Sequence, residues 1–264
     1  MSLQWILLHP PPGAVDSDER RLRGRPGWSN FRLKVVGLIL LTAGTFSRSV
    51  LFPTLVGKPA ADVSFWSLTG ALALEVASWA AIPIYAWLLV QGFRRTRSFP
   101  RYFVRLLVLA VICEAPYDLG NAWKPFDFGS QNPIFGLVFC LVILWVLRRL
   151  EGRKDIGATG LRLLVVLAGV LYMMVLHIDQ HQTIIFGGLI MLGFTLIFQY
   201  LDGRENTMIM AATFWGILGA MFPSLGLLAI HSRNDELGYK HAWTPWVFYA
   251  LYPVMLLAFA LPHI

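Results

Sequence analysis

The feature that most constrains this 264-residue chain is a series of long apolar segments that recur along most of its length. Most are about as long as a helix needs to be to cross the hydrocarbon core of a bilayer, roughly 17 to 25 residues. The segments lie near residues 33–54, 66–92, 103–120, 132–149, 161–178, 183–200, 206–230 and 246–263. Because lipid cannot bond to backbone N–H and C=O groups, each segment must satisfy them internally. The sequence therefore predicts an all-α integral membrane protein, a polytopic bundle of about eight transmembrane helices.

Two of these segments are long enough to be kinked or divided. Segment 66–92 contains Glu75 and Pro83, and segment 206–230 contains Pro223. Since proline breaks or bends a helix, the predicted count ranges from eight to ten. Composition agrees with lipid as the solvent, because 56% hydrophobic residues and a mean hydropathy of +0.61 exclude a soluble domain of this size.

The distribution of Lys and Arg predicts an orientation for eight spans. If the N-terminus is cytoplasmic, most of the 22 basic residues fall in the tail and in the loops that alternate on the same side. The opposite loops contain only Lys58, Lys124, Arg233 and Lys240, and Arg48 lies within the first span. Basic residues favour the cytoplasmic side during insertion. Both termini are therefore predicted to be cytoplasmic.

The start of the chain is a poor secretory signal, because its short apolar stretch has no basic residue before it and prolines after it. We interpret residues 1–32 as a flexible cytoplasmic tail and residues 33–264 as a single transmembrane helical domain. Nucleic-acid binding is not expected, since the basic residues are not gathered on one solvated face.

Ionisable side chains inside the spans are candidates for function, because placing them in hydrocarbon is costly. They are Arg48, Glu75, Glu114, Asp118 and Asp179. Glu114 and Asp118 are four residues apart and share one helix face. They are either buried acids that take part in chemistry, or acceptors that cap loops near the outer interface.

Two histidines, His177 and His181, have a spacing that can hold a metal ion if the segment is helical. No third ligand is identifiable nearby, so a polar external turn is favoured and no metal site is predicted.

A basic cytoplasmic segment offers a second kind of site. Arg94, Arg95, Arg97 and Arg105 could contact the phosphates of an acyl-CoA or anionic lipid headgroups. Positive charge on a cytoplasmic loop is also explained by topology alone.

Several short motifs, taken in order, resemble the TraX family of membrane proteins over roughly residues 33–257. They are Leu33-Lys34-Val35-Val36-Gly37-Leu38, Gly92-Phe93, Thr96-Arg97-Ser98, Tyr102, Arg105-Leu106, Glu114-Ala115-Pro116-Tyr117-Asp118, Asn132-Pro133-Ile134-Phe135, Asn234, Gly238, Phe248-Tyr249 and Tyr252-Pro253. The resemblance implies a bacterial inner-membrane protein with a fold related to membrane-bound acyltransferases. Family members are similar to pilin acetylases, which take the acetyl group from acetyl-CoA and use a histidine as general base.

The chain departs from the family pattern at three separate places. Counted from Lys34, the family's Asp-His pair, with its histidine eleven positions on, corresponds here to Gly44 and Thr45. An arginine in the second span corresponds to Trp79, and the phenylalanine of the turn after it to Ile82. The histidine of the last span corresponds to Met255. Thr45, Trp79 and Met255 replace polar groups of the family pattern by side chains that cannot accept a proton at neutral pH.

The leading hypothesis is therefore a TraX-like scaffold with a degenerate active site, acting as a non-catalytic accessory subunit that binds another membrane protein and needs no cofactor. The framework polar residues Lys34, Asn132 and Asn234 remain. The alternative is an acetyl-CoA-dependent acyltransferase whose base has moved to Glu114, Asp118, His177 or His181. A transporter is a weaker hypothesis, because the chain shows no two related halves.

Overall fold

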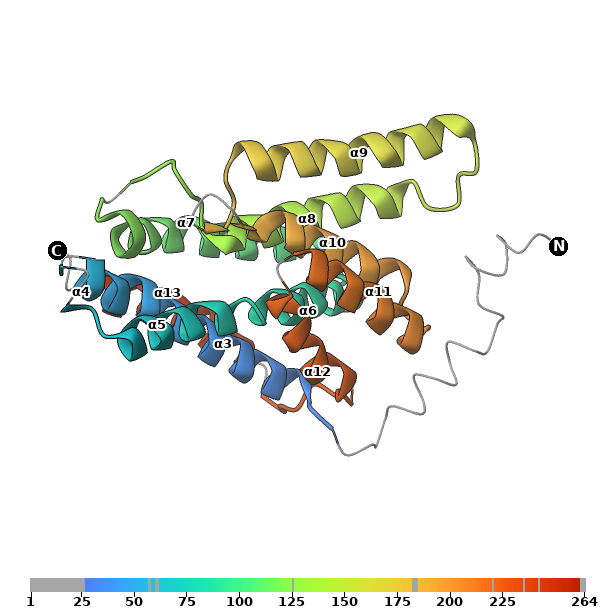
Figure 1. Ribbon diagram of the computed structural model, residues 1–264. Helices are drawn as coiled ribbons and strands as arrows, with labels where there is room; N and C mark the ends of the chain where they lie inside the picture. Colours follow the sequence, from blue (N-terminus) through green and yellow to red (C-terminus); the bar gives the residue numbers. More distant parts are fainter. Residues whose placement is uncertain are drawn as a thin grey trace.

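The computed structural model describes residues 27–261, except for residues 57, 60, 61, 125, 182–184, 220, 235 and 242. The described residues are mostly helical (Figure 1). The helices are α3 (Asn30–Phe46), α4 (Phe52–Val56), α5 (Phe65–Ser78), α6 (Ala81–Arg95), α7 (Phe99–Ala122), α8 (Pro133–Arg149), α9 (Ile156–Val175), α10 (Gly187–Tyr200), α11 (Glu205–Leu218), α12 (Gly226–His231) and α13 (Thr244–Ala260). Shorter elements are the π-helical turn η1 (Ser47–Leu51), the 3-10 turn η3 (Phe222–Leu225) and an antiparallel pair of strands, β1 (Gln180–His181) and β2 (Ile185–Phe186). The predicted helical fold is confirmed, apart from this small pair of strands.

Each of the eight apolar segments is helical over most of its described residues, and the two uncertain ones are divided. Segment 66–92 breaks between α5 and α6 at Trp79 and Ala80, and Pro83 lies in the first turn of α6, where a missing N–H costs least. Among the described residues, three helical stretches are long and apolar enough to cross a membrane: Asn30–Val56, Phe65–Arg95 and Ile156–Val175. This is consistent with a membrane protein, whereas the number of crossings stays a prediction.

The core of the bundle is built around α6. Its Trp87 is fully buried and meets the edge of Phe198 on α10, with ring centroids 5.5 Å apart. Helix α9 lies on the outside of the bundle beside α8 (Figure 1), and many of its large apolar side chains are exposed. An outer helix with an exposed apolar face is what contact with lipid or with another apolar surface requires.

Segment 206–230, predicted either as one span or as two shorter elements, is divided and turns back on itself. Helix α11 runs away from the end where it starts, and the η3–α12 segment runs back toward that end. The contact that shows this joins Arg233, just after α12, to Glu205 at the start of α11. Between them Met221 adopts a positive φ of 66°. The segment is therefore a helical hairpin with both ends on one side of the bundle.

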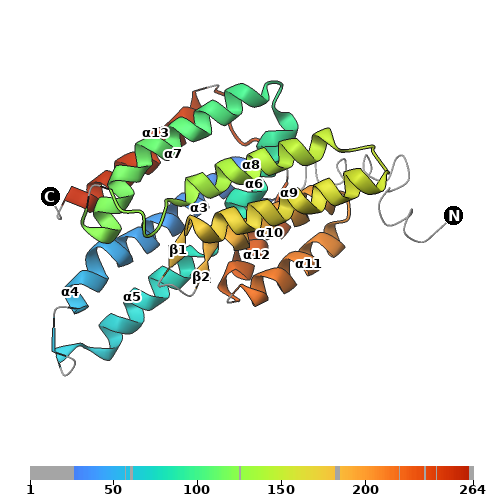
Figure 2. The same cartoon turned by 90° about the horizontal axis from the view of Figure 1, so that it is seen from above.

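The hairpin changes where the last loop and the last helix lie. The described residues of the last loop, 232–234 and 236–241, lie against the chain that enters α3, where the backbone N–H of Trp28 donates to the carbonyl of Ser232 and that of Phe31 to the carbonyl of Leu237. Helix α13 begins at this end, lies alongside α7 (Figure 2) and ends near the last residue of α3, where Phe259 contacts Phe46. The prediction that the two termini share one side does not agree with this arrangement: residues 27 and 261 lie at opposite ends of the bundle.

We call the end of the bundle that contains the start of α3 the basic end. The last loop, which we predicted on the other side, brings Arg233 and Lys240 to it. Outside this end, the described part of the chain has only Lys58, Lys124 and Arg48 as basic residues. The bias in charge between the two ends is therefore stronger than the sequence alone indicated.

Candidate functional site

A buried ion pair lies at the π-helical turn η1 in the first apolar segment. The Nε atom of Arg48 is 3.2 Å from Oε2 of Glu75 on α5, and both side chains are largely buried. The same Nε atom donates to the carbonyl of Gly44, 3.5 Å away. π-Helical turns inside α-helices occur often at functional sites, which makes this cluster the first candidate.

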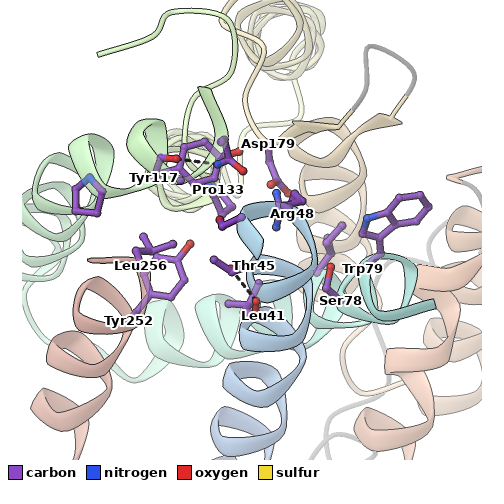
Figure 3. Close-up of a pocket in the computed structure, with 15 residues that line it drawn as sticks. Leu41, Thr45, Arg48, Ser78, Trp79, Tyr117, Pro133, Asp179, Tyr252 and Leu256 are labelled. Atoms are coloured by element: carbon purple, nitrogen blue, oxygen red, sulfur yellow. Dashed lines mark hydrogen bonds between the residues drawn. The ribbon is translucent and has the colours of Figure 1, made fainter. Parts of the chain in front are cut away.

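A second carboxylate, Asp179, points toward Arg48 from the segment between α9 and β1 (Figure 3). Its backbone has a φ of 50°, a left-handed conformation that aspartate tolerates better than most residues. The N–H of Asp179 donates to Gln131 at 2.9 Å, and its carbonyl accepts from the N–H of Gly187 at 3.1 Å. A Cβ on Gly187 would collide with the Asp179 carboxylate, so this position requires glycine. The surrounding chain thus holds Asp179 in an uncommon conformation, as functional sites often do.

A small cavity of about 20 Å³ opens beside Arg48 and Asp179. Thr45, Tyr117 and Tyr252 also line it (Figure 3). This volume is enough for about one water molecule.

A larger cavity of about 280 Å³ shares Asp179 and Tyr252 with the small one. It extends to Lys34, Tyr102 and Tyr249 at the basic end. We call it the chamber. Most of its lining is hydrocarbon, so an apolar space connects the basic end with the Arg48–Asp179 cluster.

Glu114 and Asn132 lie outside both cavities and join two helices. Glu114 Oε2 accepts from the backbone N–H of Asn132 at 3.2 Å and also from its side-chain amide. Asn132 in turn donates to the carbonyl of Ala110 and accepts from the N–H of Ile134 at the start of α8. Asn132 is thus the N-cap of α8, anchored to α7.

Asp118, like Glu114, lies outside both cavities and accepts a hydrogen bond from the backbone. Its Oδ2 accepts from the backbone N–H of Asp127 at 2.9 Å and so ties the loop after α7. For both acids, the structure has the contacts expected of the capping alternative.

An Asn132→Ala variant is expected to lower the free energy of unfolding by about 2 kcal/mol, because the N-cap and a buried side-chain bond are lost together. Thermal unfolding in mild detergent measures the change. Asn121→Ala is the matched control, since Asn121 is exposed and bonds only to the carbonyl of Tyr117 among the contacts described. Equal losses in the two variants would contradict this role for Asn132.

The two histidines do not have the helical spacing considered above. Helix α9 ends at Val175, and His177, with a φ of 49°, is exposed. The side chain of His181 lies outside the described residues. Among the residues that the structure describes, no group of three or more His, Cys, Asp or Glu could hold a metal ion.

The predicted phosphate-binding arginines separate into different roles. Arg94 donates to the carbonyls of Phe198 and Gln199 and pairs with Asp202, so it caps the end of α10. Arg105 packs over the ring of Trp246 on α13.

The other two predicted arginines, Arg95 and Arg97, are exposed at the basic end. The predicted framework residue Asn234 shapes the last loop by accepting from the N–H of Glu236 at 3.2 Å.

Lys34 is the predicted polar residue that does reach the chamber. Its Nζ atom lies 5.2 Å from the ring centroid of Tyr239 and 5.7 Å from that of Phe248. Burial raises the pKa of Tyr239, so this ring stays neutral beside the ammonium group. Four tyrosines of the two cavities belong to the family motifs: Tyr102, Tyr117, Tyr249 and Tyr252. They were not predicted as site residues, because a tyrosine in an apolar segment carries no charge that marks it.

Two of the three positions that depart from the family pattern line the small cavity: Thr45 and Trp79. The third, Met255, accepts a hydrogen bond at its sulfur from Thr42 on α3, one turn before Thr45. A sequence model of the TraX protein family matches residues 32–261. Neither the curated proteins nor the solved structures contain a match.

Proposed function

Because the chain belongs to the TraX family, we propose that it is a bacterial inner-membrane protein that keeps an acyltransferase-like scaffold without ordinary acyltransferase activity. It acts as an accessory subunit that binds another membrane protein. The observation that carries this proposal is the lining of the two cavities: no histidine is among the described residues that line them.

The family resemblance implies a histidine at the position of Thr45 and an arginine at that of Trp79. Both positions lie beside Arg48, where a reacting group would have to bind. Threonine and tryptophan cannot take a proton at neutral pH, and the loss of a general base lowers a rate by about 10²–10⁴-fold. Arg48 is meanwhile paired with Glu75, so the buried cation of this cluster already has a carboxylate partner.

The membrane location is supported by the three long apolar stretches and by the concentration of basic residues at one end. We place the basic end in the cytoplasm, where loops carry an excess of Lys and Arg. The C-terminus then lies in the periplasm. The exposed apolar face of α9, which includes Leu163, Leu167 and Leu171, is available to lipid or to a partner helix.

The test combines an acyl-transfer assay with co-purification in mild detergent. Protein extracted from its native membrane is expected to leave acetyl-CoA unconsumed and to bring down one enriched membrane protein. Acetyl-CoA consumption well above the detergent blank would overturn the proposal. Recovery of a lone monomer would contradict its accessory part.

A second candidate, an acyltransferase with a relocated base, is favoured by one observation. Asp179 is the carboxylate that lines both cavities, whereas Glu114 and Asp118 line neither. This candidate requires that acetyl-CoA is consumed, that Asp179→Asn lowers the rate by at least about 10²-fold, and that Glu114→Gln does not. If the wild-type protein shows no turnover, this candidate fails.

A further inference from the structure

We propose that the chamber is a binding site for a single-chain anionic amphiphile, with the acidic head at Lys34 and the alkyl tail between α3, α6, α7 and α8. The proposal shares the membrane location of the proposed function but does not depend on the loss of catalysis.

The size and lining of the chamber fit an alkyl chain. Leu38, Leu88, Leu109, Ile134 and Leu137 form much of its wall. Its volume of about 280 Å³, against about 20 Å³ for the small cavity that holds about one water molecule, gives room for an alkyl chain of roughly ten or more methylene groups. Apolar cavities of this size are unfavourable for water, and leaving them unfilled destabilises a protein.

The head position is defined by the contacts of Lys34. Its ammonium group lies within about 6 Å of the centroids of two aromatic rings, which attract the cation without neutralising it. In the described part of the chain no carboxylate lies within ion-pair distance of its Nζ atom. An ammonium group has three N–H donors, and a carboxylate or phosphate monoester supplies both the charge and the acceptors.

The surroundings of Lys34 attract anions and offer two more polar contacts. Tyr102 and Tyr249 line the same end of the chamber, and the exposed Arg95 and Arg105 lie at the same end of the bundle. A concentration of positive charge at one mouth raises the local concentration of anionic ligands.

The lining also argues against a ligand with many polar groups. The polar side chains of the wall are Lys34, Asp179 and tyrosines, and the rest is hydrocarbon. The amide-rich arm of coenzyme A would leave polar groups without partners along this wall, which is costly. We therefore infer that the occupant of the middle of the chamber is a plain alkyl chain.

Fluorescence titration with dansylaminoundecanoic acid, a single-chain carboxylate, tests the site on the delipidated full-length protein in mild detergent. We expect saturable binding that palmitate displaces and methyl palmitate does not. Lys34→Gln is expected to weaken binding at least about tenfold, as does the loss of a charged hydrogen bond. Leu137→Trp, which fills the chamber and leaves the head position intact, should also weaken it.

Lys154→Gln and Leu163→Trp are the matched controls, because both side chains are exposed away from the chamber, and they should bind like wild type. Displacement by lysophosphatidic acid in preference to palmitate would identify a lipid phosphate as the head, and the reverse order a free fatty acid. Absence of saturable binding, equal displacement by methyl palmitate, or unchanged affinity in Leu137→Trp would overturn the proposal. Stronger displacement by acetyl-CoA than by either amphiphile would also overturn it, and the acyl-transfer assay would separately decide the proposed function.

Discussion

An Arg233→Ala variant is expected to unfold with a free energy about 3 kcal/mol lower than that of the wild-type protein. Arg233 is 4% exposed, and its two terminal nitrogens contact the two carboxylate oxygens of Glu205 at 2.7 and 2.6 Å. Its guanidinium group also lies 4.1 Å from the ring centroid of Trp87 in the core. Breaking a buried pair by removing one partner costs about 3–5 kcal/mol. We expect a loss at the lower end of this range, because the Glu205 side chain is 26% exposed and water screens the pair in part.

Thermal unfolding in detergent and titration with a denaturing detergent measure the loss for this variant. Arg153→Ala is the matched control, since Arg153 is an exposed arginine in a loop of the basic end and should change stability by less than about 0.5 kcal/mol. A double-mutant cycle with Glu205→Ala isolates the coupling between the two side chains. Similar stabilities of Arg233→Ala and Arg153→Ala would show that the closing contact of the hairpin contributes nothing.

The same contact explains why the sequence could predict the helices but not the course of the chain. Hydropathy is a local property, and segment 206–230 has the length and composition of one crossing. Pro223 marked a possible break, but a break does not tell whether the chain continues or turns back. The direction depends on contacts between distant parts of the sequence, such as Arg233 with Trp87, which no local pattern contains.

At the candidate site too, local sequence patterns predicted which residues matter but not how they come together. Arg48, Glu75 and Asp179 were each expected to matter because charge in hydrocarbon is costly, and each is part of the buried cluster. Their meeting depends on the left-handed turn at Asp179 and on the close approach of Gly187, which are tertiary features. The spacing of Glu114 and Asp118 was a stronger local pattern, yet these side chains contact backbone groups outside both cavities.

A reporter fused after residue 261 is expected to give a periplasmic signal. Because α11 and α12 return to the basic end, α13 begins there and ends at the opposite end of the bundle. With the basic end in the cytoplasm, alkaline phosphatase fused to the C-terminus should be active, and green fluorescent protein at the same position should stay dark. An arrangement of eight full crossings with a cytoplasmic N-terminus requires the reverse result, so the expected effect is all-or-none.

Fusions at two internal positions provide the reference signals for the cytoplasm and the periplasm. A fusion after Arg153, in the loop between α8 and α9, should report the cytoplasm, and one after Lys124, in the loop between α7 and α8, should report the periplasm. The C-terminal fusion should match the one after Lys124. If it matches the one after Arg153 instead, segment 206–230 crosses the membrane and the hairpin is wrong. In that case Arg233 and Glu205 would lie on opposite sides of the bilayer, and their double-mutant cycle would show no coupling.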